Sequence, residues 1–178
     1  MEPGAFVLAE AFADDPLMSY FWPRTQRRRR ALPLFWSSRI ASRRRNGLVD
    51  LAYDAEGKLA CVALWEPAGV VSSMAKPLTL LRATGRGTVR VLAAARQLDQ
   101  ARHGTPQWYL AAIGTLPRAQ GRGLAAQLIQ RRLPSAGQPC FLIANSRDLV
   151  PFYQRFGFEP QGALPIGHGP VVYPMVRT

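Results

Sequence analysis

Two arginines and two glycines stand together in the stretch IGTLPRAQGRGLAAQLI, residues 113–129. An apolar pattern of helical spacing follows Gly123, so the glycines lie where a helix begins. The first amides of a helix lack partners inside it, and the helix dipole adds positive charge beside them. Gly121 and Gly123 would let ligand oxygens reach those amides, while Arg118 and Arg122 can add charge-assisted hydrogen bonds. The stretch predicts a phosphate-binding turn, with an ordinary tight turn as the alternative.

Other ligand-binding motifs do not fit the chain. No lysine followed by Ser or Thr completes a Walker A loop, and no GxGxxG followed by an acidic residue completes a dinucleotide fingerprint. Cys61 and Cys140 lie in apolar runs and are expected to be buried free thiols, since no CxxC or Cys/His spacing indicates a metal. We therefore expect no metal site.

The first half of the chain predicts helices followed by a β-hairpin. A helix with Ala5, Leu8, Ala9 and Phe12 on one face is expected to end before the segment Asp14-Asp15-Pro16. A basic segment is expected to be helical after Pro33 and to end at Asn46-Gly47. The two hairpin strands are expected at residues 47–54 and 59–67, joined by a short turn.

The second half predicts alternating helices and strands. Residues 74–102 are mostly helical with an interruption at 85–87, and a strand at 106–115 carries a bulge at Gly114. The helix after the glycine turn buries one apolar face and ends at Pro134. The later elements are a strand at 139–144, a short helix at 146–157 and closing strands at 158–165 and 169–177. This order predicts one α/β domain over residues 1–178 with a mixed sheet.

The net charge of the chain limits the classes of binding partner but does not single out one of them. The 178-residue chain has a net charge of +12, almost all from arginine, which suits nucleic acid, an anionic membrane or a phosphorylated ligand. The runs Arg27–Arg30 and Arg43–Arg45, with Phe35 and Trp36 between them, make the case for nucleic acid. A solvated helix face is the alternative, and no helix-turn-helix, zinc finger or RNP pattern is present.

The N-terminal sequence indicates no secretion signal. The first residues carry acids and no basic region, and no apolar run has the length of a membrane span. We expect a cytoplasmic protein.

A longer pattern surrounds the glycine turn. Gln120-x-x-Gly123-x-Ala125 follows a strand that ends in GTLP, and VPFYQRFGFE lies downstream. Together these segments resemble the GNAT superfamily of N-acetyltransferases over nearly the whole chain. EAFADDP, VALWEP, QWYLAAIGTLP and GPVVYPMVR are most similar to its puromycin N-acetyltransferase branch. The resemblance implies acetyl-CoA as the donor and a mostly antiparallel mixed sheet, flanked by helices and splayed at the acyl-CoA site.

The resemblance also draws attention to a strand that is expected at the start of the chain but is not found there. Superfamily members usually open with a strand, whereas this chain starts almost directly in a helix. If that edge strand is missing, residues 47–54 become a sheet edge. We expect a homodimer or some other protection of that edge.

The site residues follow from the resemblance. The pyrophosphate would bind amides from Gln120 to Ala125, the pantetheine arm would pair with Ile113–Thr115, and a bulge amide there would polarise the thioester carbonyl. Tyr153 would protonate the departing thiolate, because a reference pKa of about 10 keeps it protonated. The expected cofactor-binding residues are Ile113, Gly114, Thr115, Arg118, Gln120, Gly121, Arg122, Gly123, Leu124, Ala125 and Asn145.

The general base is harder to assign. Residues 106–147 contain no Asp, Glu or His. Relatives in the puromycin branch carry a glutamate where this chain has Ile143 and an asparagine where it has Leu149. The base must then be Asp14, Asp15, Glu66, His103 or His168, unless a water chain removes the proton or the acceptor is already neutral. The expected acceptor-binding residues are Asp15, Tyr20, Trp22, Trp65, Glu66 and His168, with the aromatic residues alternatively in the core and Glu66 alternatively a solvated rim carboxylate.

Three functions remain open. The first is transfer of an acetyl group from acetyl-CoA to a small amine, such as an aminonucleoside or an antibiotic-like compound. The second is a catalytically weak acyl-CoA-binding or regulatory protein of the same fold, suggested by Ile143 and Leu149. The third is a basic domain that binds nucleic acid without sequence preference.

Overall fold

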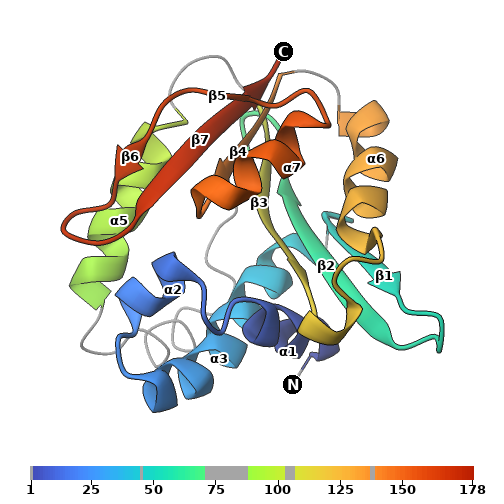
Figure 1. Cartoon of the computed structure of the whole chain (residues 1–178), viewed down its shortest axis with the longest axis horizontal. Helices are drawn as coiled ribbons and strands as arrows, with labels where there is room; N and C mark the ends of the chain where they lie inside the picture. Colours follow the sequence, from blue (N-terminus) through green and yellow to red (C-terminus); the bar gives the residue numbers. More distant parts are fainter. Residues whose placement is uncertain (1, 45, 71–87, 103–106, 137–138) are drawn as a thin grey trace.

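The computed structural model describes residues 2–44, 46–70, 88–102, 107–136 and 139–178. Its helices lie around a central sheet (Figure 1). The helices are α1 (Pro3–Ala11), α2 (Pro16–Phe21), α3 (Thr25–Arg44), α5 (Thr88–Gln100), α6 (Leu124–Ala136) and α7 (Val150–Gln154), with short 3-10 turns η2 (Pro117–Ala119) and η3 (Arg147–Leu149). The strands are β1 (Val49–Tyr53), β2 (Leu59–Glu66), β3 (Trp108–Thr115), β4 (Cys140–Ala144), β5 (Glu159–Pro160), β6 (Leu164–Pro165) and β7 (Val171–Arg177).

The sheet has the predicted mixed, mostly antiparallel character. Its strand order is β1-β2-β3-β4-β7-β5, with β6 pairing β7. Every described pair is antiparallel except β3 with β4. The parallel pair covers only residues 108–110 and 140–142, after which β3 and β4 separate. The strand separation expected from the GNAT resemblance is therefore present.

The bulge in β3 does not lie where the sequence predicted it. Leu64 pairs with Ala112 but its neighbour Trp65 pairs with Leu110, so Ala111 is the extra residue of β3. Gly114 is regularly paired and is needed for a different reason. A Cβ on Gly114 would lie 2.9 Å from the Cβ of Ala11 and 3.0 Å from side-chain atoms of Leu8 and Phe12. Glycine at this position lets α1 pack closely on the strand.

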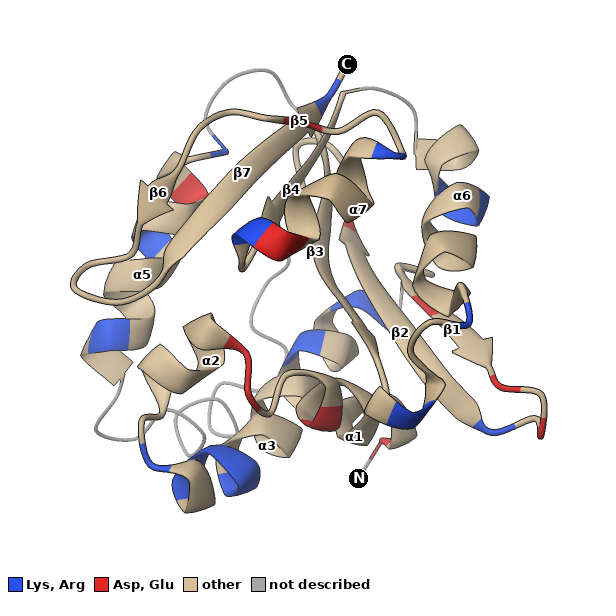
Figure 2. Cartoon of the chain, viewed as in Figure 1, with Lys and Arg blue, Asp and Glu red and all other residues tan. Residues whose placement is uncertain are grey.

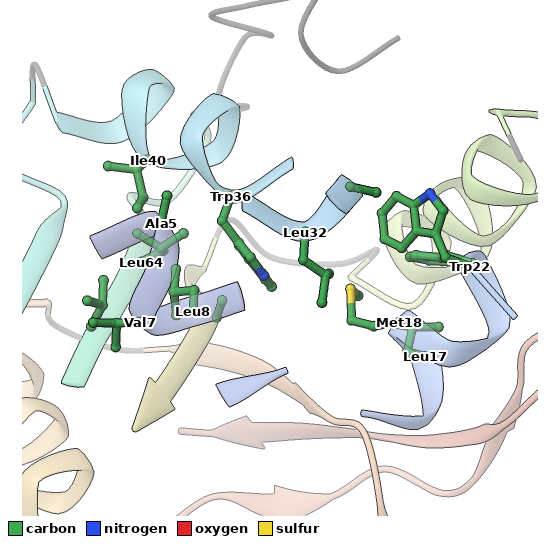
Figure 3. Close-up of a cluster of buried hydrophobic side chains, with 14 of the residues drawn as sticks. Ala5, Val7, Leu8, Leu17, Met18, Trp22, Leu32, Trp36, Ile40 and Leu64 are labelled. Atoms are coloured by element: carbon green, nitrogen blue, oxygen red, sulfur yellow. The ribbon is translucent and has the colours of Figure 1, made fainter. Parts of the chain in front are cut away.

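The core divides between the two faces of the sheet. Successive residues of β2 point to opposite faces, so Val62 and Leu64 join one cluster while Cys61, Ala63 and Trp65 join the other. The first cluster includes the buried faces of α1, α2 and α3 (Figure 3). The second lies under α6 and α7, where Leu128, Ile129 and Tyr153 are buried. The predicted apolar face of α6 is thereby confirmed.

Two prolines lie inside helices, although the sequence predicted a helix that starts after Pro33 and another that ends at Pro134. The helix α3 begins at Thr25 and continues through Pro33, and α6 continues past Pro134 to Ala136. Proline removes one helical hydrogen bond. In α3, Leu32 on one side of Pro33 and Trp36 on the other are both buried, so tertiary packing holds the helix together. The expected helix at 74–87 lies outside the described residues.

One edge of the sheet is β1, as expected if no strand precedes it. Side chains of α6 reach this edge: Arg131 donates to the carbonyl of Leu51, and Arg132 donates to the carbonyl of Gly47 and to Asp50. Part of the edge is therefore covered from within the chain, and dimerisation there stays a prediction. Among the described helices, none combines the length and apolarity that crossing a bilayer requires.

Candidate active site

A cavity of about 1090 Å³ lies where β3 and β4 separate. Its wall combines residues of α1, α2, α3 and α5 with residues of β3, β4, α6 and α7. The structure thus gathers segments that are far apart in the sequence. The predicted site residues on this wall are Asp15, Ile113, Gly114, Thr115, Gln120, Gly121, Gly123, Leu124, Ala125, Asn145 and Tyr153.

The glycine turn forms the end of the cavity at the N-terminus of α6. Gly121 and Gly123 have φ angles of +76° and +77°, a region that costs a residue with a side chain about 1–2 kcal/mol. A Cβ on either glycine would meet nothing within 4 Å. Their backbone is therefore open to an approaching group, beside the partial positive charge of the helix N-terminus. This geometry fits the diphosphate of a coenzyme.

Arg118, which was predicted to bind the coenzyme, pairs with an aspartate in the structure. Its Nη1 donates to Oδ2 of Asp54 at 2.7 Å, and Oδ1 of Asp54 accepts from the amide of Lys58. The arginine thus fastens the β1–β2 turn to the segment that precedes the glycine turn. Arg122 is exposed, and neither arginine is among the described residues of the cavity wall.

Tyr153 lies in α7 with its side chain directed into the second core cluster and the cavity. It is only 7% exposed. Burial raises the pKa of its phenol, and the nearby charge of Asp15 and the thiol of Cys61 raise it further. Tyr153 is therefore held in its protonated form, which a proton donor requires.

Asp15 stands at the start of α2 and connects the N-terminal segment to β4. Its Oδ1 accepts from the amide of Met18 at 2.9 Å as the N-cap of the helix. Its Oδ2 accepts from Nδ2 of Asn145 at 2.9 Å. Burial raises the pKa of Asp15, although the hydrogen bonds from Met18, Asn145 and Leu17 oppose that rise. Asn145, expected on the coenzyme, thus holds the carboxylate at the end of β4.

A buried arginine positions the loop that carries Asp15. Arg28 donates to the carbonyls of Ala13 and Trp22 and lies 3.6 Å from Asp14. It belongs to the arginine run that the sequence presented as a nucleic-acid surface or a solvated face. One of the four arginines is instead buried and structural, and nothing in the repetitive sequence distinguishes it from its neighbours.

Several residues predicted to bind the acceptor lie away from the cavity wall. Trp22 and Trp65 are buried in the two core clusters, as the alternative reading had it. Tyr20 packs against Gly167 and Gly169, and His168 between them is exposed. None of these four is among the described residues that line the cavity. His103 lies outside the described residues.

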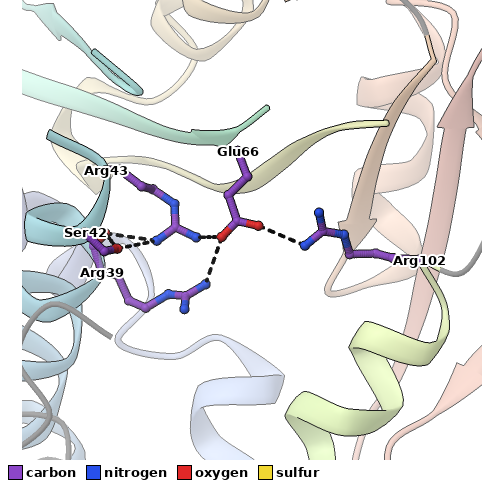
Figure 4. A network of polar contacts seen from close by, with 5 residues as sticks. All are labelled: Arg39, Ser42, Arg43, Glu66 and Arg102. Atoms are coloured by element: carbon purple, nitrogen blue, oxygen red, sulfur yellow. Dashed lines mark hydrogen bonds and ion pairs between the residues drawn. The ribbon is translucent and has the colours of Figure 1, made fainter. Parts of the chain in front are cut away.

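Glu66 is neither a solvated rim carboxylate nor a free base. It is buried at the end of β2, where its Oε1 contacts Arg43 and Arg39 and its Oε2 accepts from Arg102 at 2.8 Å (Figure 4). Because arginines surround both oxygens, the residue serves a structural ion network. The sequence carries no local sign of this arrangement, since the partners come from residues 39–43 and 102.

The cavity also contains residues that sequence reasoning did not assign. Glu10, Arg39 and Tyr109 belong to its wall, and so does Asp14, which the sequence had offered as a possible base. Ile143 and Leu149, noted as departures from the puromycin branch, line it too. Within the described part of the chain, no group of three His, Cys, Asp or Glu residues is placed to hold a metal ion.

Comparison with known proteins places this arrangement in a family. The sequence model of the acetyltransferase (GNAT) domain matches residues 89–178. A solved structure from Corynebacterium glutamicum, described as histone acetyltransferase HPA2 and related acetyltransferase, is 27% identical with a TM-score of 0.74, and the match covers 98% of this chain and 88% of that chain. The polyamine N-acetyltransferase of Drosophila melanogaster shares the fold at 18% identity and a TM-score of 0.64, covering 96% and 90% of the two chains. The chain therefore belongs to the acetyltransferase (GNAT) domain family.

Proposed function

We propose that the protein transfers the acetyl group of acetyl-CoA to the amine of a small molecule. The observation that carries this proposal is the composition of one cavity. An open glycine turn lies at one end, the separated strands β3 and β4 lie in the middle, and Tyr153 and Asp15 face the same space. Family membership supports acetyl transfer as the reaction class.

The coenzyme would lie along β3. The amides of residues 120–125 would hold its diphosphate, because the glycines leave them accessible. Residues 113–115 have no β4 partner, so that side of the strand can pair with the pantetheine arm. Bound acetyl-CoA supplies an acetyl thioester, whose carbonyl oxygen needs a hydrogen-bond donor as it gains charge. The irregular backbone at Ala111 is the candidate donor.

Asp15 and Tyr153 would divide the proton transfers. The bound ammonium first releases one proton to solvent, and Asp15 takes the second proton as the neutral nitrogen bonds to the acetyl carbon. Tyr153 gives its phenolic proton to the sulfur as the carbon–sulfur bond breaks. Asp15 and Tyr153 line the same cavity, and we expect the proton gained by the carboxylate to restore the phenol. The balance leaves an amide and a free thiol.

An amine acceptor fits the charges near Asp15. Glu10 and Asp14 line the same cavity and attract an ammonium group. Among solved structures of this fold, two are described as polyamine and agmatine N-acetyltransferases. The puromycin-branch motifs make an aminonucleoside one acceptor to test, and that assignment stays a prediction.

A second candidate is an acyl-CoA-binding protein without turnover. The observation that favours it is the presence of Ile143 and Leu149 on the cavity wall, where the puromycin branch has a glutamate and an asparagine. Such a protein would keep the glycine turn and the coenzyme site. It would bind acetyl-CoA but would lack the proton transfers that acetylation of an amine requires.

Thermal stability and thiol release together test the proposal. Acetyl-CoA at one hundred times its Kd should stabilise the protein by about 2.7 kcal/mol, seen as a rise in Tm of several degrees. With a panel of amines, free thiol should appear at a rate that Tyr153→Phe lowers about 100-fold. Tyr173→Phe, which changes a half-buried tyrosine of β7 outside the cavity wall, is the matched control.

The outcomes separate the candidates. A rise in Tm without thiol release on any amine favours the acyl-CoA-binding protein. Thiol release that Tyr153→Phe leaves unchanged overturns the assigned acid. If acetyl-CoA changes neither Tm nor thiol release, the proposed function is wrong.

A further inference from the structure

The ion network around Glu66 holds more positive than negative charge. Three guanidinium groups, those of Arg39, Arg43 and Arg102, surround one carboxylate, which leaves a formal surplus of two positive charges (Figure 4). Arg43 is fully buried, and burial together with the charge of Arg39 lowers its pKa to about 10. A surplus of this kind is costly in a protein interior unless an anion compensates it.

Arg39 is the member of this network that faces the cavity. It lies on α3 beside Phe35 and Trp36, which share the cavity wall, and its side chain is 35% exposed. Its Nη2 lies 3.9 Å from Oε1 of Glu66, beyond hydrogen-bond distance. Arg43 and Arg102 make the closer contacts with Glu66. The guanidinium of Arg39 is therefore placed to serve a ligand.

The network lies at a distance from the reacting groups. Glu66 pairs with Tyr109 at the start of β3, whereas the proposed thioester site begins near Ile113. Four residues of a strand span about 13 Å, and the extra residue at Ala111 shortens that distance. One cavity wall includes both Tyr109 and Ile113. An acceptor that spans the cavity must therefore be elongated.

We propose that the acceptor carries a carboxylate at the end opposite its reacting amine, and that Arg39 binds this carboxylate. The inference rests on the proposed function and names the acceptor class of the same cavity: ω-amino carboxylates. Glu10, Asp14 and Asp15 receive the ammonium end, and Arg39 offers a planar fork of donors that matches a carboxylate. The anion also compensates the surplus charge of the network.

This charge arrangement makes a diamine a poor acceptor. Its second ammonium would face Arg39, with the charges of Arg43 and Arg102 behind it. An alkylamine avoids that repulsion but gains no ion pair. The expected order of kcat/KM is ω-amino carboxylate, then alkylamine, then diamine, for acceptors of equal chain length.

The test uses those three acceptors with the wild type and two variants. Arg39→Gln removes one of the two arginines on the cavity wall and leaves Arg155, while Glu66 keeps Arg43 and Arg102, so the fold is expected to survive. Arg30→Gln removes the same charge from an exposed position of the same helix and is the control. Arg39→Gln should lower kcat/KM for the amino carboxylate at least tenfold, mostly through KM. It should leave the alkylamine unchanged and improve the diamine.

Binding of the amino carboxylate to the protein with CoA, measured by calorimetry, separates this inference from the proposed function. Binding that Arg39→Gln weakens and Arg30→Gln does not, even without thiol release on any amine, supports the carboxylate site while the proposed function fails. Equal turnover of the three acceptors, with no change in Arg39→Gln, overturns the inference while the proposed function stands. Tighter binding of the diamine than of the amino carboxylate overturns it as well.

Discussion

Single carboxylates in this protein acquire different properties from their surroundings. Asp15 is half-buried beside amide donors rather than a cation, and its pKa is raised. Asp54 accepts a hydrogen bond from Arg118, which lowers its pKa. Burial favours the neutral acid, while a nearby cation favours the anion. A carboxylate with a raised pKa on a cavity wall is the better candidate for a general base.

Replacing Asp15 by asparagine should separate activity from stability. A base acts only when deprotonated, so wild-type turnover should rise with pH through the raised pKa of Asp15. We expect Asp15→Asn to lower kcat at least tenfold and to remove that limb of the pH–rate profile. Asp14→Asn changes the adjacent exposed carboxylate, so it should raise KM for the amine but keep kcat and the limb. Equal loss in both variants would contradict a specific role for Asp15.

The same variant has a defined effect on unfolding. A raised pKa means that the folded state holds the proton more tightly. The stability that this provides is present at pH values below the ordinary aspartate pKa and is lost as pH rises through the raised value. Asparagine avoids the charge and can still cap α2. The unfolding free energy of Asp15→Asn at neutral pH should therefore equal or exceed that of the wild type.

At the scale of elements, the sequence predicted the features that neighbouring residues determine. It did not predict those that depend on contacts between distant segments. The hairpin, the α6 face and the glycine turn each follow from a few neighbouring residues, and the structure contains all three. The helix through Pro33 depends on core packing that spans the proline. The burial of Glu66 depends on arginines brought from distant segments, and the strict need for Gly114 depends on where α1 lies. Such features have no local signal.

The glycine turn permits a test in which strain and ligand contact are separated. Gly123→Ala should destabilise the fold by about 1 kcal/mol, because its φ of +77° disfavours a side chain. It should also weaken acetyl-CoA binding at least tenfold, because the new methyl group enters the open space beside the amides. Gly57→Ala, in the β1–β2 turn, has a φ of +73° and equally open surroundings. It should lose similar stability in thermal denaturation and bind acetyl-CoA normally; weakened binding in both variants would refute the site.

At the scale of the whole molecule, the acidic residues of the segment 10–15 stand out in a chain that is otherwise strongly basic. The chain has 23 Lys and Arg residues against 11 Asp and Glu. Figure 2 shows acidic positions between α1 and α2, with basic positions on α3. The cavity wall combines carboxylates from residues 10–15 with Arg39 of α3 and with Arg155, which directly follows α7. The basic surroundings suit a polyanionic donor, and the local acids suit an ammonium group.

The positive charge of the protein predicts that salt weakens the binding of acetyl-CoA by screening the attraction to its phosphates. A charge of +12 attracts polyanionic acetyl-CoA over long range, and physiological ionic strength screens such attraction beyond about 8 Å. The KM for acetyl-CoA should therefore rise severalfold between low and physiological salt while kcat changes little. S-acetylpantetheine provides the control, since it carries the thioester without phosphates and its kinetics should not respond to salt. Equal responses of the two donors would show that salt alters the protein itself, and the net charge would then have no part in capturing the coenzyme.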